Sequence, residues 1–210
     1  MKALTLYDRG STLLIIGGVL MLCLIVGGYF LMSDRAGQNS VRGIELESFG
    51  TVPEDPVFTE RSGREMRLGE LRGAPWVASF IFTRCQGICP IMTESLGVLQ
   101  DDLDPESRVK LVSFTVDPEY DTPERLAEYA TEHNADSDRW LFLRTGDSVV
   151  QNLARDAFHV AIAEGTDPME PIIHSSKFFV VDAEGEVRGI FDGRSQEGRR
   201  RLLSLLKSLY

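Results

Sequence analysis

Two cysteines four residues apart carry the strongest chemical signal in this chain. Cys85 and Cys89 lie in the stretch FIFTRCQGICP, between an apolar run and Pro90. The residues after Pro90 have the spacing of an amphipathic helix, so both thiols are expected at a helix N-terminus. Partial positive charge there favours thiolate over thiol, and Arg84 adds a full positive charge beside them. The sequence therefore predicts two thiols that ionise readily.

The same pair of thiols is compatible with several roles. The plainest reading is a pair of small buried residues without a chemical role. Cysteines four apart on a first helical turn come within bridging reach, so an inert disulfide is a second reading and a reversible redox couple a third. Metal binding is the last. Two thiolates are too few for a structural zinc site, which normally has four ligands, whereas they suit Cu(I), which favours soft sulfur. A third ligand would favour the metal reading.

His174 is the best candidate for that third ligand among the three histidines. It lies in the loop PMEPIIHSSKFF directly before an apolar strand, where Ser175 and Ser176 are able to orient it. His133 ends a polar helix, and His159 lies in the alternating stretch AFHVAIA. Both of these positions favour a solvated or structural role over a ligand role.

The segments around these residues predict an α/β fold with a mixed sheet. Apolar runs typical of buried strands cover residues 76–82, 109–116, 140–143, 177–181 and 187–190, the last two around a DAEG turn. Helices are expected at 90–99, from the Thr122 cap to about His133, at 148–158 and at 195–209, and two short extended pieces around Ser62-Gly63 precede a helical turn at 68–71. Chemistry in such folds gathers beyond the carboxyl ends of parallel strands. Cys85, Cys89 and Asp117 are therefore expected at one edge of the sheet.

The first fifty residues predict a membrane anchor followed by a tether. Residues 13–32 contain no charge over 20 positions, which as a helix is about 30 Å, the thickness of a bilayer's hydrocarbon core. No A-x-A-like cleavage site follows, and the residues before Cys23 are not small, so a cleaved signal or a lipoprotein is disfavoured. We expect a tail at 1–12, a transmembrane anchor at 13–32, a linker at 33–52 and one domain at 53–210. The short tail favours a single pass with the domain on the outer side, periplasmic or equivalent.

Charge and cysteine content exclude two classes of protein. The formal net charge is −10, which argues against nucleic acid as a partner because such binding depends on neutralising phosphates. Outside the anchor there are two cysteines, too few for a small disulfide-stapled scaffold.

The chain resembles the Sco (SenC) family, membrane-anchored, thioredoxin-like (peroxiredoxin-like) proteins implicated in copper delivery to cytochrome c oxidase. The stretches FIFTRCQGICP, TVDPEYDTPERL and HSSKFFVVDAEGEVRG carry the likeness, together with the N-terminal anchor. C-x-x-x-C separates the chain from ordinary thioredoxins, which have C-x-x-C. The resemblance implies that Cys85, Cys89 and His174 are the ligands of one copper ion, as Cu(I) or Cu(II). It also implies that Asp117 and Asp121 are supporting residues near the site.

Three positions depart from the family pattern. Members commonly read C-P-D-x-C-P, where this chain has Gln86 and Gly87, and they often carry aspartate where this chain has Ile173. Each lost carboxylate is one that attracts a cation or orients a ligand, so metal affinity is expected to shift, although the ligand set survives.

The resemblance implies a metallochaperone rather than a turnover enzyme. Its partners would be the copper-site subunit of the oxidase, other copper chaperones and thioredoxin-like reductants. The alternative is a thiol–disulfide oxidoreductase that reduces the copper-site cysteines of that partner. A thiol peroxidase is disfavoured because its T-x-x-C pattern is one residue short at Thr83.

Overall fold

The computed structural model describes residues 47–167, 170–173 and 175–209. The anchor expected at 13–32 and the candidate ligand His174 lie outside the described residues. Within those three ranges, no helix combines the length and the apolar character needed to cross a bilayer.

A seven-stranded mixed sheet forms the centre of the domain. Its order is β2-β1-β5-β4-β3-β8-β9, and its three middle strands, β3 (Trp76–Ile81), β4 (Lys110–Thr115) and β5 (Trp140–Arg144), run parallel. The flanking strands β1 (Val57–Glu60), β2 (Glu65–Arg67), β8 (Lys177–Val181) and β9 (Val187–Asp192) pair antiparallel. The expected mixed α/β architecture is therefore confirmed.

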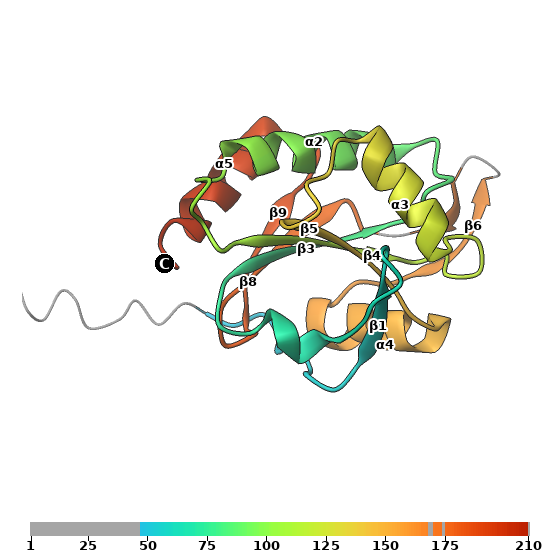
Figure 1. Cartoon of the computed structure of the whole chain (residues 1–210), viewed down its shortest axis with the longest axis horizontal. Helices are drawn as coiled ribbons and strands as arrows, with labels where there is room; N and C mark the ends of the chain where they lie inside the picture. The colour runs from blue at the N-terminus through green and yellow to red at the C-terminus, as the bar shows by residue number, and fades with distance from the viewer. Residues whose placement is uncertain (1–46, 168–169, 174, 210) are drawn as a thin grey trace, which may run out of the picture. The chain divides into compact units, whose positions relative to one another are not determined.

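Helices cover both faces of this sheet. Figure 1 shows α2 (Ile88–Asp102), α3 (Pro123–Glu132) and α5 (Gln196–Leu206) over one face and α4 (Asp147–Phe158) over the other. The predicted cap of α3 is confirmed, because the Thr122 hydroxyl accepts a hydrogen bond from the Arg125 amide at 3.3 Å. The helical turn expected at 68–71 is the short 3-10 helix η1 (Leu68–Leu71).

Aromatic rings fill the space between the sheet and α4. Phe80 of β3 stacks on Phe114 of β4 with ring centroids 5.6 Å apart, and Phe158 of α4 meets Phe80 edge to face at 5.5 Å. The parallel register places Phe80 beside Phe114. Full burial of each ring stabilises the fold by about 1.5–3 kcal/mol. This packing fixes the position of β3 in the sheet, and the cysteine loop follows β3 directly in the chain.

The sheet's other face carries a buried polar contact. Ser79 and Ser113 share a hydrogen bond between their hydroxyls at 2.9 Å, and the Trp140 indole donates to the Ser113 hydroxyl at 3.0 Å. Every buried polar atom of this group is thereby satisfied, which keeps three neighbouring strands in register under α2 and α3.

The structure departs from the sequence prediction in one region above all. A separate two-stranded hairpin, β6 (Ala163–Asp167) and β7 (Glu170–Ile173), stands where no strands were expected. His159 is not part of a strand. It ends α4 in a left-handed conformation with φ 54°, and its Nε2 lies 2.7 Å from the Phe49 carbonyl oxygen.

The residues directly before β1 are hydrogen bonded to the β8–β9 hairpin. The Phe49 amide donates to the Val187 carbonyl and the Val52 amide to the Gly185 carbonyl, both at 2.9 Å. Gly185 has φ 82°, a left-handed conformation that glycine adopts without steric cost, and it completes the predicted DAEG turn. Residues 49–52 thus contact the domain that they precede in the chain.

Candidate metal and thiol site

Cys85 lies in the loop that connects β3 to α2, and Cys89 lies at the start of α2. The loop turns back at Phe82, whose carbonyl accepts from the Cys85 amide at 3.3 Å. Gly87 caps α2, which begins at Ile88, two residues before the expected start, so Cys89 sits in the first turn. The Cys89 amide donates to the Cys85 sulfur at 3.5 Å. The helix N-terminus therefore points a backbone donor at the Cys85 sulfur, and such a donor stabilises negative charge on sulfur.

Both side chains are thiols in this structure, and both are buried. The pKa of Cys89 is raised, first because its side chain is hydrogen bonded to Cys85 and second because burial disfavours the charged form. The prediction that both thiols ionise readily is therefore wrong for Cys89. A helix N-terminus favours a thiolate, but at Cys89 the hydrogen bond with Cys85 and, second to it, burial outweigh that effect.

Arg84 does not turn its charge toward the thiols as expected. Its Nε lies 2.5 Å from the Asp117 carboxylate, and its guanidinium stacks over the Tyr120 ring at 5.0 Å. The hydrogen bond to Asp117 raises the pKa of Arg84. Asp117 is 7% exposed, so it partners the arginine from a largely buried position and neutralises its charge beside the cysteine loop.

Asp121 is fully buried and fastens the start of the cysteine loop. Its carboxylate accepts from the amide of Thr83 at 3.1 Å and from the hydroxyls of Thr83 and Thr115, each at 2.5 Å. Burial raises the pKa of Asp121, although the threonine hydrogen bonds act in the opposite direction. The loop residue two positions before Cys85 is thus fixed to the end of β4.

A hollow of about 350 Å³ lies beside this loop. Arg84 and Asp117 line it on one side, and Ala163, Gly165 and Ile172 of the β6–β7 hairpin line it on another. His174 follows the last residue of β7, Ile173. The hairpin that precedes His174 in the chain therefore borders the same hollow as the residues that flank the cysteine loop.

Four of the five candidate site residues are brought to the same edge of the sheet, namely Cys85, Cys89, Asp117 and Asp121. His174 lies outside the described residues. Among those that are described, no three histidine, cysteine or acidic side chains gather in a group able to hold a metal ion. Of the departing positions, Gln86 is exposed and Gly87 is the helix cap.

Sequence reasoning missed three contributors to this edge. Thr83 and Thr115 hold Asp121, and Tyr120 supports Arg84. The signal for Tyr120 was present in the sequence, because it lies within the same short loop as Asp117 and Asp121. No sequence pattern marked the two threonines, because they meet Asp121 only when the ends of β3 and β4 lie side by side.

Comparison with known proteins gives a consistent result. The SCO1/SenC family model matches residues 51–209. A relative from Bacillus subtilis (strain 168), described as a SCO1 protein homolog, is 35% identical over 191 residues, covering 88% of this chain and 94% of the relative.

Solved structures agree with that match. BsSco, described as a member of the Sco family of cytochrome c oxidase assembly proteins with a disulfide switch, is 32% identical with a TM-score of 0.69, over 78% of this chain and 95% of that chain. Bradyrhizobium japonicum ScoI with copper bound has a TM-score of 0.58 at 19% identity, over 76% of this chain and 99% of that chain. At 19% identity, the similarity to ScoI shows a shared fold and nothing further. The mixed sheet and its helices are thus the thioredoxin-like fold of these structures.

Proposed function

Because this chain belongs to the SCO1/SenC family, we propose that it binds copper and serves in the assembly of cytochrome c oxidase. Copper is its cargo, held by the sulfurs of Cys85 and Cys89 and by the imidazole of His174. The observation that carries the proposal is the hydrogen bond from the Cys89 amide to the Cys85 sulfur. It holds two thiols within one helical turn of each other, at the end of a buried strand.

The chemistry of these residues fits copper. Two thiolates and one imidazole form a soft ligand set that suits Cu(I), and the imidazole also suits Cu(II). Both sulfurs are buried, so a bound ion would be shielded from water and from competing thiols. A structural zinc site normally has four protein ligands, one more than this set supplies.

The surrounding residues have distinct supporting roles in this proposal. Asp121 positions the cysteine loop through Thr83. Asp117 keeps the charge of Arg84 away from the ion by pairing with it. The β6–β7 hairpin borders the hollow beside the loop, which supports the approach of His174 to the sulfurs from that side.

The proposal places the domain on the outer side of a membrane, tethered by the anchor at 13–32. From there it would pass copper by ligand exchange to the copper-site subunit of the oxidase, after receiving it from another copper chaperone. Thioredoxin-like reductants would keep Cys85 and Cys89 in the thiol form that binds the metal. The protein then acts as a metallochaperone, not as a turnover enzyme.

A second candidate function uses the same thiols to reduce a disulfide in the partner. The structure favours an ordered pair, because Cys85 accepts a backbone hydrogen bond while Cys89 is fully buried with a raised pKa. The Cys85 thiolate would attack the partner's disulfide, form a mixed disulfide and release one partner thiolate. Cys89, on losing its proton, would attack Cys85 and release the second partner thiolate, leaving a Cys85–Cys89 disulfide.

The number of copper ions bound per chain tests the copper-binding function. Trapping of a mixed disulfide with the partner tests the reductase function. The full-length protein, purified with reductant and loaded with Cu(I), should hold one copper per chain, and Cys85→Ser should hold none. Copper bound equally by the Cys85→Ser variant would refute the site. If reduction is the main activity, Cys89→Ser should accumulate a mixed disulfide with the oxidase subunit, and His174→Asn should reduce that subunit at the wild-type rate.

A further inference from the structure

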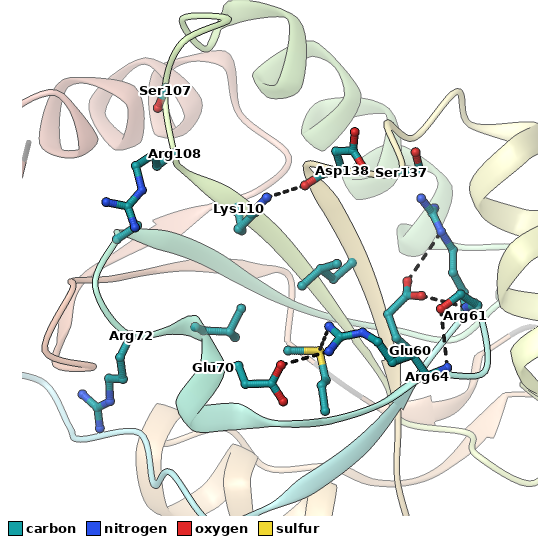
Figure 2. A pocket seen from close by; sticks show the side chains of 15 residues that line it. Glu60, Arg61, Arg64, Glu70, Arg72, Ser107, Arg108, Lys110, Ser137 and Asp138 are labelled. Atoms are coloured by element: carbon teal, nitrogen blue, oxygen red, sulfur yellow. Dashed lines mark hydrogen bonds and ion pairs between the residues drawn. The ribbon is translucent and has the colours of Figure 1, made fainter.

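A second hollow lies on the face of the sheet that α4 occupies, at the opposite end of the parallel strands from the cysteines. It has a volume of about 630 Å³, within the range of about 300–1,000 Å³ typical of small-molecule sites. Residues that precede or begin the parallel strands form one side, among them Ala74, Lys110 and Asp138, and the β1–β2 turn with η1 forms the other. Figure 2 shows these side chains around the opening.

One residue that lines this hollow, Arg61, has a buried donor atom without a hydrogen-bond partner. The Arg61 side chain is 10% exposed, its Nε lies 3.6 Å from the Glu60 carboxylate, and its Nη2 donates to the Asp136 carbonyl at 3.4 Å. Its Nη1 is buried and has no hydrogen-bond partner. A buried donor without an acceptor costs about 1–3 kcal/mol, and more when it is charged. The guanidinium is nonetheless held in place, 5.2 Å from the Phe142 ring centroid.

Unsatisfied atoms are concentrated at this one place. Three buried side-chain atoms in the described ranges lack a hydrogen-bond partner: Glu60 Oε1, Arg61 Nη1 and Arg72 Nη1. Of these, Glu60 Oε1 still forms an ion pair with Arg61 Nε at 3.6 Å. All three belong to residues that line this hollow. The Arg72 guanidinium is turned away from the opening in Figure 2 and is engaged with the Val52 carbonyl and the Glu54 carboxylate. Arg61 and Glu60 are therefore the pair that a ligand in the hollow would meet.

The charge of the lining selects the kind of ligand. Five basic and three acidic side chains line the hollow, although the whole chain has a net charge of −10. Glu70 is already engaged by Arg64 at 2.9 Å, and Lys110 donates to the Asp138 carbonyl. The apolar side chains of Met66, Leu71 and Leu141 also line the hollow. The lining thus combines a positive rim with an apolar surface.

We propose that this hollow binds a small organic anion, whose carboxylate or phosphate accepts a hydrogen bond from Arg61 Nη1. Lys110 and Arg108 add positive charge, and the body of the ligand covers the apolar side chains. A hydroxyl on the ligand, or the acidic proton of a phosphate monoester, satisfies Glu60 Oε1. The site is separate from the thiols, so occupancy does not require copper, and it goes beyond the proposed copper function.

Binding of defined anions to the full-length protein tests this site. Calorimetric titrations at constant ionic strength would use citrate and malate as carboxylate probes, and glycerol 3-phosphate and inorganic phosphate as phosphate probes. We expect saturable binding by at least one class, and the class that binds identifies the anion. Arg61→Met should weaken it on the order of tenfold or more, since a charge-assisted hydrogen bond is lost.

Two further variants keep the test decisive if Arg61→Met unfolds. Lys110→Met removes a rim charge at a partly exposed position and should also weaken binding severalfold. The matched control is Arg67→Gln, an exposed arginine of β2 that does not line the hollow, and it should bind as the wild type does. Absence of saturable binding by all four probes would overturn the proposal, as would equal weakening by Arg67→Gln and Lys110→Met.

Discussion

The carboxylate of Asp121 accepts hydrogen bonds from both the amide and the hydroxyl of Thr83, although 38 residues separate the two in the chain. Thr83 lies two residues before Cys85, so this contact ties the cysteine loop to the end of β4. The position of the thiols therefore depends on a buried carboxylate that does not belong to the proposed ligand set.

Loss of the Asp121 carboxylate should destabilise the fold. Asp121→Ala leaves the Thr83 amide and two threonine hydroxyls without their acceptor, so we expect a loss of about 2–4 kcal/mol in the free energy of unfolding. Asp121→Asn keeps one acceptor and should lose about 1–2 kcal/mol. Urea unfolding of the reduced, metal-free protein measures both. A loss below about 1 kcal/mol in Asp121→Ala would show that the loop is held by other contacts.

The stability of Asp121→Asn relative to wild type should also depend on pH. Burial raises the pKa of Asp121 in the folded protein, so folding favours the protonated carboxyl. Its contribution is fully present below the pKa of the unfolded chain, about 3.9, and is lost as pH rises through the raised folded value. The wild type should therefore lose stability relative to Asp121→Asn from acidic to neutral pH. A constant difference would mean that the folded pKa is not raised.

The ion pair between Arg84 and Asp117 should control the ionisation of the thiols. Asp117→Asn removes a negative charge and frees Arg84, so the pH midpoint of cysteine alkylation by iodoacetamide should fall. Arg84→Gln should move the midpoint upward or leave it in place. The double variant separates the two causes, because a fall that persists without Arg84 comes from the lost carboxylate alone. An unchanged midpoint in Asp117→Asn would show that this pair does not influence the thiols.

Truncation of a central ring should weaken the whole domain. Phe80 is fully buried among aromatic neighbours, so Phe80→Ala should cost about 3–5 kcal/mol in the free energy of unfolding. Phe49 offers a matched control, because 42% of it is exposed and Phe49→Ala should cost less than about 1 kcal/mol. Similar losses in the two variants, measured by urea unfolding, would contradict the assignment of the core.

Local patterns predicted the strand, loop and helix that carry the thiols. The apolar run from Trp76 and the proline at position 90 are local signals, and β3 and α2 form where those signals are strongest. The helix nevertheless begins two residues earlier than expected, at Ile88. Its cap residue, Gly87, makes no side-chain hydrogen bond that the sequence could have revealed. Caps of this kind leave little trace in a sequence.

What the sequence could not show depends on contacts between distant segments. Arg84 meets a carboxylate 33 residues further along the chain, so its charge looked available when read in isolation. The β6–β7 hairpin, AEGTD and EPII, lacks the apolar alternation by which a strand is recognised. Both features border the hollow beside the cysteine loop, and both emerge only when the chain folds.

Copper affinity should rise with pH. The pKa of Cys89 is raised by its hydrogen bond with Cys85 and by burial, so a bound ion must displace a proton that the thiol holds strongly. Each proton released on binding contributes up to about tenfold in affinity per pH unit. Competition against a Cu(I) chelator between pH 6 and pH 8, corrected for the chelator's own titration, measures the slope. An affinity that does not change over this range would argue against thiolate ligation.

The most direct measurement of the central claim is the Cu(I) affinity of His174→Asn in the full-length protein, set against His159→Asn as its matched control. Asparagine tolerates the left-handed conformation of residue 159, so the control removes an imidazole without strain. We predict that His174→Asn weakens Cu(I) binding on the order of tenfold to a hundredfold, while His159→Asn binds as the wild type does. Equal, wild-type affinity in both variants would contradict the three-ligand site and leave a dithiol as the working chemistry of this protein.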